Sequence, residues 1–363
     1  MRYGLQLRSV GLGALFVLVF SSLGLTQKLP EGTRVWSVGP LTKAEQVTGI
    51  VFGAGGAKVT GPREDSQTGS TFRATRSVVF AGDRVILVSR AALPGPKEVD
   101  RLLSLDAKTG DIKDSRDLGF GVRAIFATND SHVIVSGASV LRLTPDLKDD
   151  GIFDCDVTGK KFCHTENVSP DGSTLGNATR PGYELLDAET LKSTVLTVNG
   201  VVDTSVSRKG FVTDNSYWTK EYPKDKAFVT FTDATGDHLL YHGKCGGRPQ
   251  FLTDDLVFEP GCKSPLIVDK SGKLVRTLSV KGEFSYAGVS QNGKRFALQV
   301  ASFSGMHSIK SEHFVVYSVN TGESIAEVTP DELAEEQSWT ALSPDGSMIV
   351  VGSPLKLTLF RLP

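Results

Sequence analysis

The sequence predicts an all-β fold: a seven-bladed β-propeller closed by an N-terminal strand that completes the last blade. Three observations predict it. A turn followed by an apolar strand recurs along the chain, the copies are spaced like propeller blades, and one strand near the N-terminus belongs to no repeat. A single blade is too small a sheet to be stable alone, so neighbouring blades must stack.

The recurring turn is clearest in SPDGSTL at 169–175, SQNGKRFALQV at 290–300 and SPDGSMIVVGS at 343–353. Asp, Asn and Gly suit tight turns because they tolerate positive φ or bond to their own backbone. A second turn, such as LDAKTGDI at 105–112, follows most copies by roughly 20–30 residues. Two turns per repeat with strands on either side indicate four strands per blade.

The spacing of the copies supports a count of seven blades. Successive anchors lie 38 to 53 residues apart. Their mean spacing of about 44 residues falls within the period of one propeller blade. The anchors are Gly82, Asp130, Asp171, Lys209, Asp254, Asn292 and Asp345.

The two ends of the chain complete the ring. The last repeat stops at Pro363 after its third strand, and the strand TRVWSVGPL at 33–41 is left without a repeat. Pairing the two would close the propeller without a free strand edge, which removes an aggregation risk. We therefore expect residues 33–41 to lie beside the C-terminal strand.

These turns also carry a resemblance to a known group. SPDG turns followed by hydrophobic-Asp-x-x-Thr-Gly turns resemble the YVTN/WD40-like repeat propellers of exported bacterial proteins, over roughly residues 76–363. The segment VYSVNTG at 316–322 comes near the YVTN tetrapeptide, while the Trp-Asp ending of eukaryotic WD40 repeats is absent. The resemblance implies a fold and little about function, because that superfamily includes scaffolds, lactonases, lyases and sensor domains.

The N-terminus predicts export. Residues 1–24 have a positive start, an apolar stretch and small residues before a cleavage point, as in a secretory signal peptide. A retained membrane anchor is the alternative, but it needs roughly 20 apolar residues, and the apolar run at 10–25 is shorter. We expect residues 25–75 to hold the closing strand and a Gly-rich connection, and residues 76–363 the repeats. The product would be a secreted or periplasmic monomer with no membrane span after cleavage.

The net charge and the cysteine content exclude some classes of binding partner and some kinds of site. A net charge of −1 argues against general binding to nucleic acid or anionic membranes. In an oxidising compartment, local disulfides would join Cys155 to Cys163 and Cys245 to Cys262, although four cysteines allow three connectivities. A metal site is the alternative, but neither pair has the CxxC spacing.

No motif predicts a catalytic residue, a metal site or a cofactor. Residues 288–295 nearly spell a P-loop, but Arg295 replaces the Ser or Thr that holds magnesium, and a strand follows where a helix is required. His238 and His242 lie in a strand-rich repeat, where four residues span roughly 13 Å, too far to share one ion. The acidic segment 146–154 lacks the Glu of a calcium loop.

Two unusually long loops, at 213–227 and 302–313, give the main indication of function. Both join the second and third strands of their blades, so they would lie on the same face. Aromatic side chains mixed with charges suit a recognition surface, although such loops can also bury their aromatics against their own blade. The side chains expected to contact a partner are Tyr217, Trp218, Tyr222, Phe303, His307 and Lys310.

The leading hypothesis is therefore an exported, non-enzymatic propeller that binds a protein, peptide or glycan partner through loops on one face. The alternative is a lactonase-like or lyase-like propeller enzyme acting on a small polar substrate near the central axis. A structural envelope protein is a third possibility. Converging Asp, Glu, His or Asn side chains at the channel mouth would favour the enzyme, and an apolar or plugged channel would favour binding.

Overall fold

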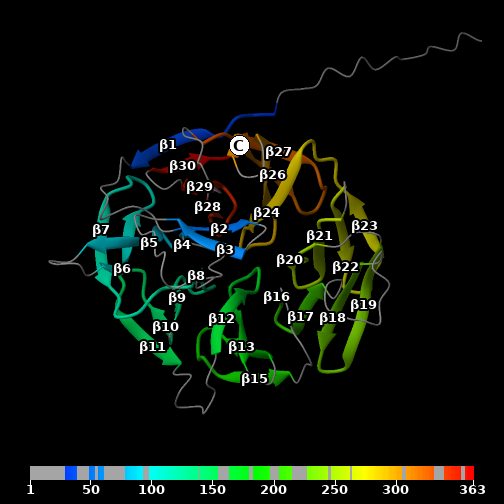
Figure 1. Ribbon diagram of the computed structural model, residues 1–363, viewed down its shortest axis with the longest axis horizontal. Coiled ribbons are helices and arrows are strands. Elements are labelled where there is room, and N and C mark those ends of the chain that lie inside the picture. Colours follow the sequence, from blue (N-terminus) through cyan, green and yellow to red (C-terminus); the bar gives the residue numbers. More distant parts are fainter. Residues whose placement is uncertain are drawn as a thin grey trace, which may run out of the picture.

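The computed structural model arranges seven four-stranded antiparallel sheets in a ring around a central axis (Figure 1). This confirms the predicted all-β, seven-bladed propeller, and the described residues contain no helix. A separate two-stranded sheet pairs β2 (Gly49–Gly53) with β3 (Gly56–Thr60). The structure describes residues 29–38, 49–53, 56–60, 78–92, 98–137, 139–153, 163–179, 183–196, 204–214, 227–243, 247–261, 264–304, 308–330, 339–352 and 356–363.

The first four blades follow the chain, each running from its innermost to its outermost strand. Blade one comprises β4 (Val78–Ala81), β5 (Arg84–Ala92), β6 (Glu98–Asp106) and β7 (Ile112–Asp117). Blade two comprises β8 (Ala124–Ala127), β9 (Val133–Ser136), β10 (Val140–Leu143) and β11 (Asp149–Phe153). Blade three comprises β12 (Cys163–Val168), β13 (Thr174–Thr179), β14 (Tyr183–Asp187) and β15 (Ser193–Leu196). Blade four comprises β16 (Thr204–Val206), β17 (Gly210–Asp214), β18 (Ala227–Asp233) and β19 (Gly236–Gly243).

The remaining three blades complete the circle. Blade five comprises β20 (Gln250–Thr253), β21 (Leu256–Glu259), β22 (Leu266–Asp269) and β23 (Leu274–Thr277). Blade six comprises β24 (Glu283–Val289), β25 (Arg295–Ser304), β26 (Ser308–Ser318) and β27 (Ser324–Val328). Blade seven comprises β28 (Trp339–Leu342), β29 (Met348–Gly352), β30 (Leu357–Arg361) and the N-terminal β1 (Thr33–Val38).

Every predicted anchor lies in the turn between the first and second strands of a blade. The side chains hold these turns as expected: Asp171 Oδ1 accepts a hydrogen bond from the backbone N of Ser173 at 3.1 Å, and Asp345 Oδ1 accepts one from Ser347 N at 2.9 Å. Because the strands are antiparallel, these turns and the third-to-fourth-strand turns lie at one end of the ring, here called the turn face. The second-to-third-strand loops lie at the opposite end, the loop face.

The hydrophobic core lies between the blades, and strand alternation places it there. In β5, Val85 and Leu87 pack in the cluster shared with blade seven, while Ile86 and Val88 pack in the cluster shared with blade two. Successive side chains of a strand point to opposite faces, so an uninterrupted apolar run serves both interfaces. This explains why the central strands are continuously hydrophobic and why a blade needs neighbours on both sides.

The N-terminal strand closes the ring, as predicted. β1 pairs antiparallel with β30, from Thr33 opposite Arg361 to Val38 opposite Leu357 (Figure 1). Residues 39–41 of the predicted strand lie outside the described residues. Pairing β1 with β30 covers the edge that blade seven would otherwise expose.

The chain just before β1 ties a second blade into the closure. Gly32 N donates to Glu327 O at 3.0 Å, and Glu327 N donates to Pro30 O at 3.0 Å, so this segment runs beside β27 of blade six. Trp36 of β1 reaches the other way, because its Nε1 donates to Ala107 O of blade one at 2.9 Å. One short segment therefore contacts blades six, seven and one.

The predicted signal peptide, the domain boundaries and the export of the protein remain predictions. Residues 1–24 lie outside the described residues, as does most of 25–75. A search of the described ranges finds no helix with the length and apolar character that a membrane crossing requires.

Candidate functional site

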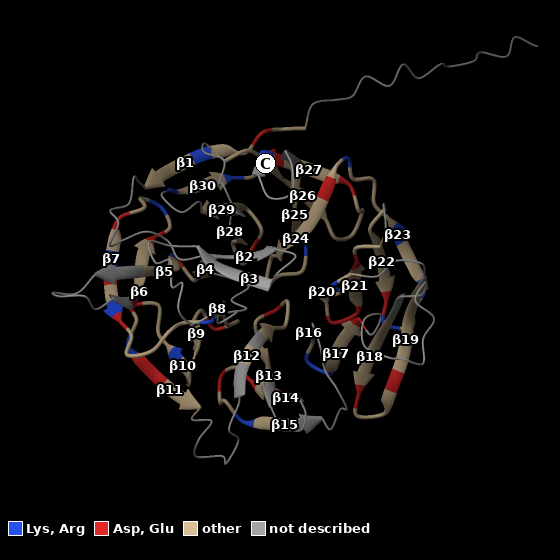
Figure 2. Cartoon of the chain, viewed as in Figure 1, with Lys and Arg blue, Asp and Glu red and all other residues tan. Residues whose placement is uncertain are grey.

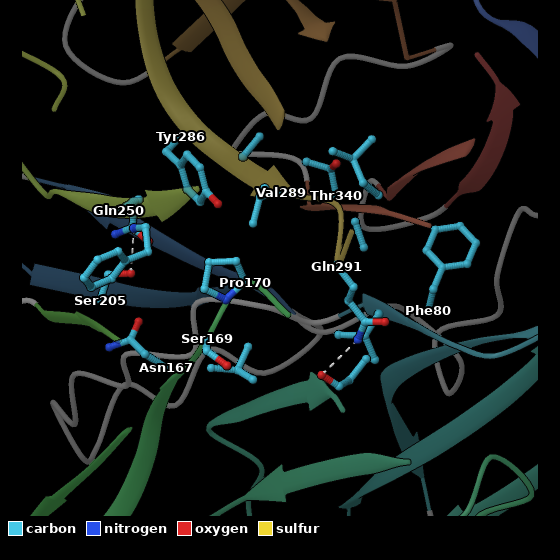
Figure 3. A pocket seen from close by; sticks show the side chains of 18 of the residues that line it. Phe80, Asn167, Ser169, Pro170, Ser205, Gln250, Tyr286, Val289, Gln291 and Thr340 are labelled. Atoms are coloured by element: carbon cyan, nitrogen blue, oxygen red, sulfur yellow. Dashed lines mark hydrogen bonds between the residues drawn. The ribbon is translucent and has the colours of Figure 1, made fainter. Parts of the chain in front are cut away.

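A cavity lies on the axis where the innermost strands of all seven blades converge (Figure 3). Its volume is about 50 Å³. The polar side chains of its wall are amides and hydroxyls, and none of its lining residues is ionisable at neutral pH. The polar lining residues are Asn167, Ser169, Ser205, Gln250, Tyr286, Gln291 and Thr340.

Gln291 spans the axis at the turn face. Its Nε2 donates to the backbone oxygens of Ala127 at 3.4 Å and Thr128 at 3.1 Å, which joins the first turn of blade six to blade two. Gly172 of blade three makes room for this amide: its φ is +75°, and an added Cβ would lie 2.9 Å from Gln291 Nε2 and 2.7 Å from Asn129 N. Only glycine fits here without displacing the bridge.

The wall of the cavity is also tied between adjacent blades. Ser205 Oγ of blade four accepts a hydrogen bond at 3.0 Å from the backbone N of Phe251 in blade five. Thr340 differs from this arrangement, because it is only 9% exposed and its Oγ1 has no hydrogen-bond partner within the described part of the chain. Within the described part of the chain, Thr340 therefore carries a buried hydroxyl whose hydrogen-bonding capacity is unmet.

Around the turn face, ion pairs link neighbouring blades. Arg208 Nε donates to Asp171 Oδ2 at 2.6 Å, and Arg208 N donates to Asp254 Oδ1 at 3.2 Å, which joins blades three, four and five. Burial alone would raise the pKa of Asp171, but hydrogen bonds from two serine hydroxyls and from Arg208 outweigh it and lower that pKa. Asp171 is thus a fixed carboxylate that organises turns and is ill suited to proton transfer near neutral pH.

A second ionic cluster lies within blade two. The Arg142 side chain is 4% exposed, and its guanidinium lies 2.5 Å from Asp130 and 3.1 Å from Asp150. His132 contacts the same two carboxylates, each at 3.3 Å. Because Asp130 belongs to an anchor turn, this cluster fixes that turn to the outer strands of its blade.

Charges of both signs on the described residues are distributed around the ring (Figure 2). Within the described residues this distribution is in keeping with the net charge of −1.

An acidic pair is buried between blades four and five. Glu259 is 0% exposed and Asp214 is 6% exposed. Burial, together with the charge of Asp214, raises the pKa of Glu259 to about 8. Shifted carboxyls are typical of active sites, but a carboxyl without solvent access cannot meet a substrate.

The blade-six segment predicted as a loop at 302–313 is largely strand, so that prediction was wrong in its secondary structure. Residues 302–304 pair with 308–311, and only 305–307 lie outside the described residues. Ser302 Oγ and Ser311 Oγ are 2.6 Å apart across the two strands, which continues the ladder. The feature is a hairpin at the loop face.

The structure locates only some of the predicted contact residues. Phe303 lies in β25 opposite Ile309, and Lys310 lies exposed on β26. Tyr217, Trp218, Tyr222 and His307 lie outside the described residues, as do Cys155, Cys245 and Cys262, while Cys163 lies in β12. Both the contact surface and the disulfides therefore remain predictions.

The motifs that resembled catalytic or metal sites serve local structure. Residues 288–295 form the end of β24, a turn and the start of β25. A strand therefore follows the turn, as predicted, where a P-loop would require a helix. His238 is exposed on β19, and its Nε2 lies 3.0 Å from Thr235 Oγ1 and 3.3 Å from Asp233 Oδ1. Within the described residues no group of three or more His, Cys, Asp or Glu side chains could hold a metal ion.

Comparison with known proteins identifies the fold and no family. No family model matches the sequence, and no curated protein matches it. Among solved structures, 749 chains match. One belongs to the crystal structure of the mitotic checkpoint complex, with a TM-score of 0.56 and 10% identity over 100% of this chain and 98% of that chain. At such low identity the likeness shows a fold alone: the chain has a WD40-like propeller fold.

Proposed function

We propose that this protein is an exported propeller that binds a protein, peptide or glycan partner through its loop face. The observation that carries the proposal is the hairpin of β25 and β26. β24 pairs with β25 only as far as Ala301, and β27 pairs with β26 only from Phe314 onward, so the hairpin extends beyond its own sheet. Its described outer residues Ser302, Lys310 and Ser311 are exposed, as a contact surface requires.

The fold is in keeping with an interaction role. The checkpoint-complex chain belongs to a protein assembly, and propellers present loops on a rigid ring. The signal-like residues 1–24 and the resemblance to YVTN/WD40-like repeats support export from a bacterial cell.

The lactonase-like or lyase-like alternative has less support. General acid–base catalysis needs a titratable group near the substrate. The side chains that line the axial cavity supply hydroxyls and amides, and the shifted carboxyl Glu259 is not among them.

A photo-crosslinking amino acid in place of Lys310 tests the proposal in the native host. We expect a discrete adduct at this position, at least about fivefold stronger than with the same amino acid at Lys294. Lys294 is the matched control because it is an exposed lysine at the opposite end of the same blade, in the turn before β25.

A second arm uses the aromatic residues of the other loop. The double variant Trp218→Ala/Tyr222→Ala should reduce the Lys310 adduct without changing the thermal unfolding temperature by more than a few degrees. Equal labelling at positions 310 and 294 would show that the loop face is not the binding surface. An adduct that persists in the double variant would show that Trp218 and Tyr222 do not contribute to binding.

A further inference from the structure

The hairpin of β25 and β26 contains a β-bulge at the very residue that the loop-face site is proposed to use. Ser302 lies opposite Ser311, and the next pair is Phe303 opposite Ile309. Lys310 is therefore the extra residue of β26, and it is exposed. An extra residue bends its strand and redirects its own side chain. The direction in which Lys310 faces a partner thus depends on where the bulge falls.

The outer sequence of the hairpin does not fix that place by itself. Serine recurs on both strands, at 302, 304, 308 and 311. Strands that are polar on both faces specify their register weakly. The buried apolar pattern of the inner part ends at Val300 of β25 and begins again at Phe314 of β26. Residues between the core and the bulge must therefore hold the two strands in place.

A chain of buried polar side chains lies at that level. Ser285 Oγ of β24 donates to Gln299 Oε1 of β25 at 2.9 Å, and Gln299 Nε2 donates to Glu312 Oε1 of β26. Gln299 is 5% exposed and Glu312 is 2% exposed. Because Ser285 bonds to the oxygen of the Gln299 amide, the nitrogen is directed at Glu312. A buried carboxyl that loses its donor is costly, so this chain ties three strands of blade six into one arrangement.

Glu312 occupies the decisive position in the ladder. It lies opposite Ala301, directly before the pair of Ser302 and Ser311 at which the bulge starts. A shift of β26 by one residue would turn Glu312 to the other face of the sheet, away from Gln299. The bond between Glu312 and Gln299 therefore opposes any movement of the bulge along the hairpin.

We propose that Glu312 is a positioning residue of the loop-face site. Its buried hydrogen bond with Gln299 sets the place of the β-bulge, and so the direction in which Lys310 meets the partner. This role rests on the loop-face binding proposed above, whereas the placement of the bulge is measured without a partner.

The variant Gln299→Glu tests the proposal, because it removes the donor and sets a second carboxyl against Glu312. Hydrogen exchange of the full-length chain, followed by mass spectrometry, should be at least about tenfold faster over residues 308–313 and within about twofold of the wild type over β29. The reciprocal variant Gln299→Glu/Glu312→Gln restores one donor and one acceptor. Its hairpin should return to within about threefold of the wild-type rate. A residue that served only global stability would change exchange in all blades alike.

The matched control is Asn320→Asp, the same change from amide to carboxyl on an exposed residue in the turn before β27. It should leave exchange of the hairpin unchanged. Gln299→Met removes the donor without adding a carboxyl, and it replaces Gln299→Glu in the exchange measurement if that variant fails to fold. The adduct of a photo-crosslinking amino acid at position 310 should fall at least about fivefold with Gln299→Glu and recover in the reciprocal variant.

Three results would overturn the proposal: unchanged exchange of the hairpin in the folded Gln299 variants, a rise of equal size in every blade, or no recovery in the reciprocal variant. The failure of the partner site looks different. A wild-type protein that gives no adduct at position 310 would refute the loop-face partner, while the exchange rates would still decide whether Glu312 places the bulge.

Discussion

Replacing Trp36 with alanine should lower the free energy of unfolding by about 3–5 kcal/mol, the usual cost of truncating a buried tryptophan. Trp36 is 8% exposed and packs in the cluster between blades seven and one. Its indole also fills the space above the blade-one turn, where an added Cβ on Gly110 would lie 2.9 Å from the ring. The variant therefore removes packing and the hydrogen bond to Ala107 where the two chain ends meet. Urea unfolding followed by circular dichroism measures the change.

Two further variants separate the contributions. Trp36→Phe keeps most of the ring packing but loses the indole N–H, so it should cost only about 1–2 kcal/mol. Thr33→Ala changes an exposed side chain on the same strand and should stay within about 0.5 kcal/mol of the wild type. A cost below about 1 kcal/mol for Trp36→Ala would mean that β1 contributes little to closing the ring.

The fold could be predicted because each blade is specified locally. Turns such as those at Asp171 and Asp345 are stabilised by bonds between residues two apart, so their sequence is sufficient to find them. The closing strand could be predicted because a ring cannot leave one blade with three strands. The segment at 302–313, between the second and third strands of blade six, was wrongly predicted as a loop. Serine-rich sequence is typical of loops, whereas here cross-strand pairing extends the ladder of β25 and β26.

The axial cavity could not be predicted in the same way. Each blade contributes only a few lining residues, and the bond from Gln291 to Thr128 joins positions 163 apart in the chain. Neither residue has a local pattern that marks it, since Gln291 simply precedes an anchor of the repeat. The available signal was positional: polar residues on the first strand of a blade, close to the anchor, face the axis. The acidic pair could not be predicted either, because Asp214 and Glu259 belong to different blades and lie far apart in the sequence.

That acidic pair makes stability depend on pH. Glu259 Oε1 accepts a hydrogen bond from Gly261 N at 3.3 Å, whereas its Oε2 has no partner within the described residues. Burial and the charge of Asp214 raise its pKa from 4.5 to about 8. The pKa of Tyr241 is also raised, first by burial and then by the nearby Glu259 carboxylate. Three titratable groups thus share one blade interface.

The Glu259→Gln variant should be more stable than the wild type at pH 9, by on the order of 3–5 kcal/mol, and nearly equal to it at pH 4. Between pH 4.5 and about 8 the folded wild type keeps a proton on Glu259 that the unfolded chain has lost, so its stability falls as pH rises. Gln is neutral at every pH and resembles the protonated acid in shape, so the variant has no such fall. Urea unfolding at a series of pH values gives both curves.

The control for this experiment is Glu283→Gln, which changes an exposed glutamate on β24 and should preserve the wild-type difference between pH 4 and pH 9. Asp171 and Asp345 are examples of aspartates with a lowered pKa, and they change protonation state at a pH below 4.5. They therefore do not contribute to the change in stability between pH 4.5 and about 8. Parallel curves for Glu259→Gln and the wild type would mean that the carboxyl is charged and solvated in the folded protein. The boundary between blades four and five would then have to open to water, and the packing around Phe251 and Val257 would have to be looser than the structure shows.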